Sequence, residues 1–169
     1  MIYLLLYVDD IIITSNNSKF LDNFTCKLNS KFPKKDLGSL SYFFSLEATS
    51  TTDGLLISQL KYARDILTRA QLLNSKHVHT PMVVSQHLTV DSPLFLDPKL
   101  YRSLIGALQY LTITHPDIAY AINFVSQFLH SLIKDHFLAV KRILLYIKGT
   151  LHFDLTFHPS APLGALVAY

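Results

Sequence analysis

Residues 1–14 constrain the fold of this chain more than any other stretch. They read MIYLLLYVDDIIIT, so that two apolar runs flank Asp9 and Asp10. Short runs rich in Leu, Ile, Val and Tyr are typical of β-strands. The apolar stretch is too short to cross a bilayer, and the aspartates interrupt it. The sequence therefore predicts strands at 3–8 and 11–14, which form a hairpin with two charges at its tip.

The two adjacent carboxylates at this tip need an explanation. Like charges repel and both groups need solvation, so the pair is costly at the end of an apolar hairpin. Divalent cations relieve that cost, and hard ions such as Mg²⁺ prefer carboxylate oxygens. Asp9 and Asp10 are therefore candidate metal ligands, although a solvated Asp-Asp turn accounts for the tetrapeptide Tyr7–Asp10 equally well.

Turn and capping residues divide the rest of the chain into short elements. Ser18 is the expected N-cap of a helix that ends at Pro33. Asp53-Gly54 between apolar runs predicts a hairpin, and Thr114 and Asp117 have the spacing of a capping box. The further expected elements are strands at 42–49 and 55–58, helices at 59–73, 98–112, 114–131 and 135–148, and strands at 153–157 and 163–168.

The order of these elements predicts an α+β fold. Half of the residues are apolar and 16% are charged, which is typical of a chain with a buried core and not of a disordered one. Residues 1–75 combine antiparallel hairpins with helices, and residues 98–150 are mainly helical. The intervening residues 76–97 show little periodicity and are typical of a connector.

Charge and cysteine content narrow the function classes only modestly. The net charge of +3 permits nucleic-acid binding without arguing for it. Lys141, Arg142 and Lys148 fit either phosphate contacts or a solvated basic helix face. Cys26 is the single cysteine, so the sequence does not indicate a secreted, oxidised fold. Without a signal peptide or a membrane span, we expect an intracellular location (cytoplasmic, nuclear or organellar) and no membrane partner.

The tetrapeptide YVDD between apolar strands resembles the active-site hairpin of reverse transcriptases. Nearly the whole chain resembles the copia-type retrotransposon Pol polyprotein in the order and spacing of its motifs. The stretches YRSLIGALQYLT, HPDIAYAIN and KRILLYIKGT are highly specific when taken together. The chain also resembles short retrotransposon-derived open reading frames of plant genomes, including mitochondrial ones.

The resemblance implies a partial palm with its primer-grip hairpin at 1–75, a connector at 76–97, a helical thumb-like bundle at 98–150 and the start of the connection toward RNase H at 151–169. Asp9 and Asp10 then match the paired catalytic carboxylates of the palm. They would bind Mg²⁺ in a two-metal site, with Asp9 the stronger candidate for direct coordination. Tyr7 matches the aromatic residue beside them, near the primer end.

Two further sets of residues match nucleic-acid contacts of the family. Phe43, Phe44 and Ser45 match the hairpin that grips the primer strand, where the family has a glycine at the position of Ser45. A serine would strain that position if it needs a positive φ. The alternative for the two phenylalanines is simple core packing.

The helix expected at 98–112 resembles the thumb helix that lies along the template–primer. Arg102, Gly106 and Tyr110 match its contact positions, and their spacing puts them on one helix face. A cation suits phosphates, a glycine permits close approach, and an aromatic ring suits sugars or bases. Alternatively, Gly106 only lets another helix pack closely.

The family's third catalytic carboxylate and its fingers lie upstream of the matched residues, and the RNase H aspartates lie downstream. The resemblance therefore implies an incomplete metal site and a chain that is inactive alone. A palm hairpin without its partner strand leaves an apolar edge, which predicts self-association.

We therefore expect a fragment of an RNA-directed DNA polymerase whose partner is an RNA/DNA template–primer. The alternatives are a non-catalytic nucleic-acid-binding module and a non-functional transposon relic. A metal-dependent phosphotransferase with a chance Asp-Asp pair is disfavoured, because the later matched stretches have no role in such an enzyme.

Overall fold

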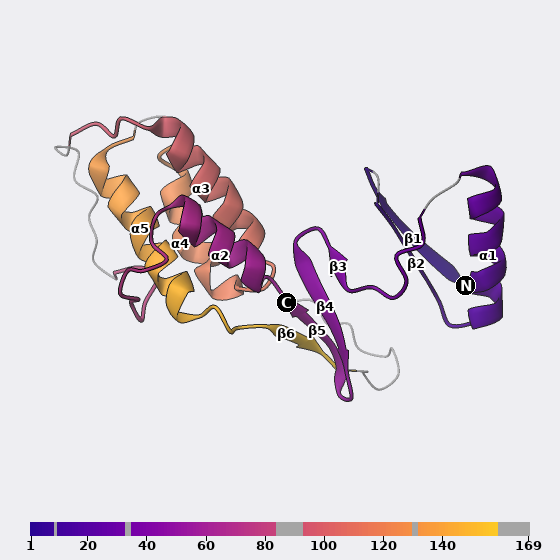
Figure 1. Ribbon diagram of the computed structural model, residues 1–169. Coiled ribbons are helices and arrows are strands. Elements are labelled where there is room, and N and C mark those ends of the chain that lie inside the picture. Colours follow the sequence, from indigo (N-terminus) through magenta and orange to yellow (C-terminus); the bar gives the residue numbers. More distant parts are fainter. Residues whose placement is uncertain (9, 33–34, 84–92, 130–131, 159–169) are drawn as a thin grey trace. The chain divides into compact units, whose positions relative to one another are not determined.

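The described residues form a mixed fold of antiparallel strands and five α-helices, which confirms the predicted α+β class. The chain divides into two compact units, Met1–Phe44 and Ser45–Tyr169. None of the helices in the described part is long and apolar enough to cross a membrane. The computed structural model (Figure 1) describes residues 1–8, 10–32, 35–83, 93–129 and 132–158.

The first unit contains the predicted N-terminal hairpin. Strand β1 (Ile2–Tyr7) pairs antiparallel with β2 (Asp10–Ser15), and Tyr7 and Asp10 are the last partners before the turn. Helix α1 (Ser18–Lys31) follows, but its N-cap is Asn17 and not Ser18. The Asn17 side chain accepts a hydrogen bond from the Phe20 backbone N–H at 3.2 Å, and asparagine caps as well as serine does.

The second unit begins with an antiparallel sheet. Strand β4 (Leu46–Thr51) pairs with β5 (Gly54–Ser58), and β5 pairs with β6 (Leu155–Phe157). Gly54 has a φ of 141°, and a Cβ there would lie 2.0 Å from the Phe157 carbonyl oxygen, so only glycine fits beside β6. The strand expected at 163–168 lies outside the described residues.

Four helices of the second unit pack side by side around its core (Figure 1). The helices expected at 98–112 and 135–148 are confirmed almost to the residue. Helix α2 precedes the predicted connector in the sequence, yet α2 packs against α3 and α5, which follow the connector. The bounds are α2 (Leu60–Arg69), α3 (Pro98–Leu111), α4 (Ala119–Ser126) and α5 (Lys134–Gly149), with a short 3₁₀ turn, η1 (Pro116–Ile118), before α4.

The prediction of one helix from Thr114 to about residue 131 is wrong in both of its bounds. Helix α4 ends at Ser126. Beyond it, the Phe95 N–H donates to the Leu132 carbonyl at 2.9 Å, and the Lys134 N–H donates to the Pro93 carbonyl at 2.9 Å. The N–H groups of Gln127 and Phe128 already donate to carbonyls three residues back, at Phe124 and Val125, so the α-helical hydrogen-bond pattern has ended before this pairing begins.

The predicted capping box is wrong as well. Thr114 is buried, and its hydroxyl donates to the side-chain oxygen of Gln59 at 2.8 Å instead of capping a helix. Asp117 accepts a hydrogen bond from the Tyr146 hydroxyl. This bond, together with burial and the carboxylate charge, raises the pKa of Tyr146 to about 12.

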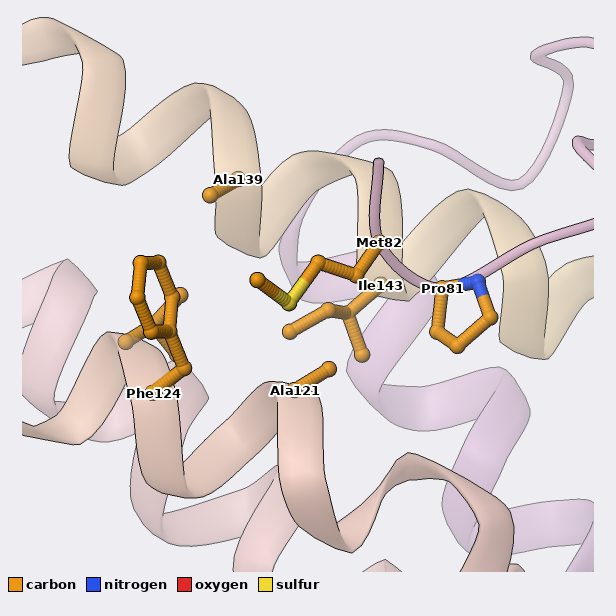
Figure 2. Close-up of a pocket in the computed structure, with 7 residues that line it drawn as sticks. Pro81, Met82, Ala121, Phe124, Ala139 and Ile143 are labelled. Atoms are coloured by element: carbon orange, nitrogen blue, oxygen red, sulfur yellow. The ribbon is translucent and has the colours of Figure 1, made fainter. Parts of the chain in front are cut away.

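The first part of the predicted connector runs along α5. The Val78 N–H donates to the Leu145 carbonyl at 3.3 Å, Arg142 donates to the Thr80 hydroxyl at 2.7 Å, and Lys148 donates to the Ser75 carbonyl. Two of the three basic residues considered for phosphate contacts therefore hold this segment. Figure 2 shows how it continues into a small apolar pocket, lined by Pro81, Met82, Ala121, Phe124, Val125, Ala139 and Ile143.

Candidate metal-binding turn and nucleic-acid interface

At the tip of the β1–β2 hairpin, Tyr7 pairs with Asp10, and Val8 and Asp9 are the two residues between them in the sequence. Val8 has a φ of 48°, which is rare for a β-branched residue and persists only where the surroundings enforce it. Asp10 is exposed at the start of β2. Asp9 lies outside the described residues, so its side chain has no described position.

The donor chemistry at this turn suits magnesium only in part. Mg²⁺ usually takes one or two carboxylates from a protein and keeps several waters, and the turn contains Asp9 and Asp10. In the described portion of the chain, no group of three or more His, Cys, Asp or Glu side chains could hold a metal ion. The residues at the tip thus fit one part of a magnesium site.

Three of the predicted site residues of the first unit lie together. The ring of Tyr7 meets the ring of Phe44 edge-on, with centroids 3.9 Å apart and an interplanar angle of 86°. The centroids of Phe43 and Phe44 are 5.1 Å apart. Residues far apart in sequence therefore form one aromatic cluster beside the candidate metal-binding turn.

The strain predicted at Ser45 is present. After β3 (Tyr42–Phe43), Phe44 has a φ of 56° and Ser45 a φ of 59°. Positive φ at both residues is the conformation of a type I′ turn, for which glycine or asparagine is preferred. A non-glycine residue costs roughly 1–2 kcal/mol in this region. Both side chains are thus held at a cost where glycine would be relaxed.

The three predicted contact residues of α3 differ in how far they are exposed to solvent. Arg102 and Gly106 are exposed, and Tyr110 is half-buried. A Cβ built on Gly106 meets nothing within 4 Å, whereas one on Gly149 would lie 3.2 Å from His77. Helix packing within the described residues therefore does not explain Gly106.

Neighbouring segments contact this face of α3 on both sides. On one side, Arg102 donates to the carbonyl of Leu129, three residues past the end of α4, at 3.2 Å. Toward α2, the rings of Tyr62 and Tyr110 meet edge-on with centroids 5.2 Å apart. Burial raises the pKa of Tyr62, although the charge of Arg69 lowers it in part.

Sequence reasoning missed several polar residues of this surface. Arg69 donates to the Ser103 hydroxyl at 3.2 Å, and Gln109 donates to the Ser126 hydroxyl at 3.4 Å. Ser103 and Gln109 could have been found from the helical repeat that contains Gly106. Arg69 could not, because its position depends on how α2 packs against α3.

Comparison with known proteins assigns the sequence to a family. Residues 1–84 match the family described as reverse transcriptase (RNA-dependent DNA polymerase). This stretch includes the candidate metal-binding turn, the aromatic cluster and α2. No solved structure matches the chain.

Relatives extend the match over nearly the whole chain. An uncharacterized mitochondrial protein of Arabidopsis thaliana is 41% identical over 162 residues, which are 96% of this chain and 68% of that protein. The retrovirus-related Pol polyprotein from transposon RE2 of Arabidopsis thaliana is 44% identical over 89% of this chain, and that from transposon TNT 1-94 of Nicotiana tabacum is 35% identical over 96%. The matched parts are 10% and 13% of these two polyproteins. The chain belongs to the reverse transcriptase family, as part of the reverse transcriptase region of copia-type retrotransposon Pol polyproteins.

Proposed function

We propose that this chain serves in an RNA-directed DNA polymerase, with the first unit as part of the palm and the bundle of the second unit as the thumb. Tyr7, Asp9 and Asp10 would act at the primer end, and the exposed face of α3 would hold the template–primer. The observation that carries the proposal is Gly106, an exposed glycine in the middle of a helix. Such a glycine costs about 1 kcal/mol relative to alanine, and close approach of a nucleic-acid backbone would account for it.

The β1–β2 turn would bind magnesium through Asp9 and Asp10. When bound, two such ions stabilise the attacking and leaving oxygens of nucleotidyl transfer. The hairpin register keeps Asp10 opposite Tyr7, and the ring of Tyr7 is held in turn by Phe44. These contacts would fix the direction of Asp10 and present an aromatic side chain next to the metal ligands.

Binding of Mn²⁺, which takes the same oxygen ligands, tests the metal site directly. Electron paramagnetic resonance titration should detect weak binding that the double change Asp9→Asn and Asp10→Asn abolishes. The matched control is Asp22→Asn, which removes an exposed carboxylate from α1 of the same unit. Equal binding by the double variant and the wild type would remove the hairpin from consideration as the metal site.

We expect residues 1–169 to lack polymerase activity by themselves, because two adjacent carboxylates do not complete a two-metal site. Primer–template, Mg²⁺ and deoxynucleotides added to the purified polypeptide should give no more extension than the Asp9→Asn variant gives. Template-dependent extension above that variant would contradict the expectation and would show that these residues suffice.

The face of α3 also supports a second function, that of a non-catalytic nucleic-acid-binding module. Fluorescence anisotropy with a labelled RNA–DNA hybrid should show binding that weakens as salt rises. Arg102→Ala should lower the salt slope by about 1, whereas Lys141→Ala, at an exposed position on α5, should not. Hybrid binding that survives loss of Asp9 and Asp10 is expected under both functions, and extension assays separate them.

We also propose that the chain associates with itself through β1. Leu4, Leu5 and Leu6 are exposed, and successive strand residues point to opposite faces, so β1 presents apolar side chains on both faces. Within the described residues, β1 pairs with β2 alone, which leaves an unpaired edge. Light scattering should show species larger than a monomer, and a monodisperse monomer would contradict this proposal.

A further inference from the structure

We infer that Arg69 of α2 is a second phosphate-binding residue beside the α3 face, so that this surface binds the two backbones of a duplex and not a single strand. The inference rests on the proposed nucleic-acid contact of α3 and adds a residue from a different helix. It follows from the packing of α2 against α3, from the hydrogen bond of Arg69 to Ser103, and from the lack of a salt bridge between Arg69 and any carboxylate of the described residues.

The packing brings Arg69 alongside the exposed face of α3. Arg69 contacts Ser103, and Tyr62 contacts Tyr110. From Tyr62 to Arg69, α2 advances seven residues toward its C-terminus, while the contacted residues of α3 move back seven, from Tyr110 to Ser103. The two helices therefore run antiparallel. Gly106 lies between Ser103 and Tyr110 on α3, and Arg69 is beside one end of this stretch.

The two guanidinium groups lie on opposite sides of the α3 face. Arg69 reaches it from α2 and donates to Ser103, whereas Arg102 donates to the Leu129 carbonyl, in the segment just after α4. Gly106 lies one turn after Arg102 on α3, and a Cβ placed on it would meet no atom within 4 Å. A cation on each side of an open glycine suits the wide, shallow minor groove of an A-form-like hybrid, which a backbone borders on each side.

Both arginines keep donors for a ligand. A guanidinium has five N–H groups. Arg69 and Arg102 each donate one hydrogen bond to a neutral oxygen. Neither forms a salt bridge with a carboxylate of the described residues. Arginine in this state can bind a phosphate with two parallel hydrogen bonds.

One acidic residue opposes the inference and supplies a test of it. Asp65 is exposed one helical turn before Arg69, so its charge lies on the same edge of α2. A carboxylate there repels phosphate, and Asp65→Asn should therefore tighten hybrid binding. Arg64 lies ~140° around the helix from Arg69, is also exposed, and provides a control with the same change in net charge.

The experiment compares Arg69→Ala with Arg64→Ala by fluorescence anisotropy, using an RNA–DNA hybrid and the two single strands of the same sequence. At ~0.1 M salt, the loss of one phosphate contact should weaken hybrid binding roughly five- to tenfold and lower the salt slope by about 1. Single-strand binding should stay within about twofold of the wild type. Ser103→Ala, which frees the guanidinium, should give a smaller loss with the same slope. Unchanged thermal melting curves confirm that the variants are folded.

The outcomes separate this inference from the proposed function. If Arg69→Ala and Arg64→Ala bind the hybrid alike while Arg102→Ala weakens it, Arg69 has no role and the α3 contact stands. If Arg69→Ala weakens single-strand binding as much as hybrid binding, the two-backbone inference is wrong. A wild-type chain without salt-dependent hybrid binding would overturn both.

Discussion

The two units bury their apolar side chains very differently. Among the described residues, every buried hydrophobic side chain lies in the second unit, where Leu104, Leu108 and Leu144 are completely inaccessible. Helix α1 of the first unit buries no residue at all. Three successive leucines of β1 are between 48% and 61% exposed. Only the second unit therefore has a core of its own.

The contrast follows from what each stretch of chain can enclose. Helices α2 to α5 bury apolar stripes against one another, and the hydrophobic effect stabilises the bundle without further partners. A two-stranded hairpin with one helix is too small to enclose a core. Such a unit suits a role as one edge of a larger sheet, as the proposed palm requires.

The largest expected effect concerns the core of the second unit, and its absence would remove the difference in burial between the two units. Leu104→Ala removes a fully buried side chain of α3 and should lower the free energy of unfolding by about 2–5 kcal/mol. The control, Leu138→Ala, changes a leucine of α5 that is 55% exposed and should cost little. Urea unfolding followed by circular dichroism measures both. Equal small losses would mean that the second unit lacks a packed core.

A buried polar network links the start of α2 with the segments that follow α3 and α5, and its loss should be the next largest effect. The Thr114 hydroxyl lies 2.8 Å from the Gln59 side-chain oxygen and 2.9 Å from His115 Nδ1, and His115 Nε2 lies 3.0 Å from the Thr150 carbonyl. Thr150 Oγ1 in turn donates to the Tyr146 carbonyl at 3.2 Å. The network therefore ties the start of α2 to the end of α5.

Thr114→Val keeps the shape of the side chain and removes its hydroxyl. It leaves Gln59 and His115 each without this partner, so the free energy of unfolding should fall by about 1–3 kcal/mol. Thr112→Val is the matched control, because the Thr112 hydroxyl makes an exposed hydrogen bond within the end of α3. A loss no larger than that of the control would show that the network contributes nothing to the stability of the second unit.

Local signals account for the elements that sequence reasoning predicted well. The strands of the β1–β2 hairpin follow from apolar runs on both sides of two aspartates. Helix α3 begins where Asp97 accepts a hydrogen bond from the Leu100 N–H at 2.9 Å and Pro98 takes the first helical position, as local capping rules require. Elements defined by their own residues can thus be predicted from sequence.

Features that depend on distant partners were beyond sequence reasoning. Thr114 looked like a helix cap, but a residue 55 positions away holds it inside the protein. Arg69 reaches Ser103 across 34 positions. At the candidate site, the family resemblance supplied Tyr7 and Phe44 separately, while their contact required the fold. The positive φ of Ser45 was anticipated without the fold, but only from the glycine that the resembled family has at this position.

The next prediction concerns Gly106 on α3, with an expected effect of about 1 kcal/mol on the stability of the second unit. Gly106→Ala should raise the free energy of unfolding by about 1 kcal/mol, because alanine favours helix and its Cβ meets no atom. It should also weaken hybrid binding, since the methyl group lies where the backbone would approach. Gly149→Ala is the control, because its Cβ would press on His77. Greater stability with unchanged hybrid binding would remove Gly106 from the proposed interface.

The smallest expected change in stability comes from the first unit. Leu5→Thr introduces a β-branched residue, which strands accept well, at a position that is 55% exposed and should change the free energy of unfolding by less than about 0.5 kcal/mol. The same variant should reduce self-association in light scattering, because it makes the exposed strand more polar. Thr14→Val, on β2, is the opposite change, because it replaces a polar side chain with an apolar one. A loss of several kcal/mol for Leu5→Thr would mean that Leu5 is buried in solution, which would contradict its exposure in the hairpin.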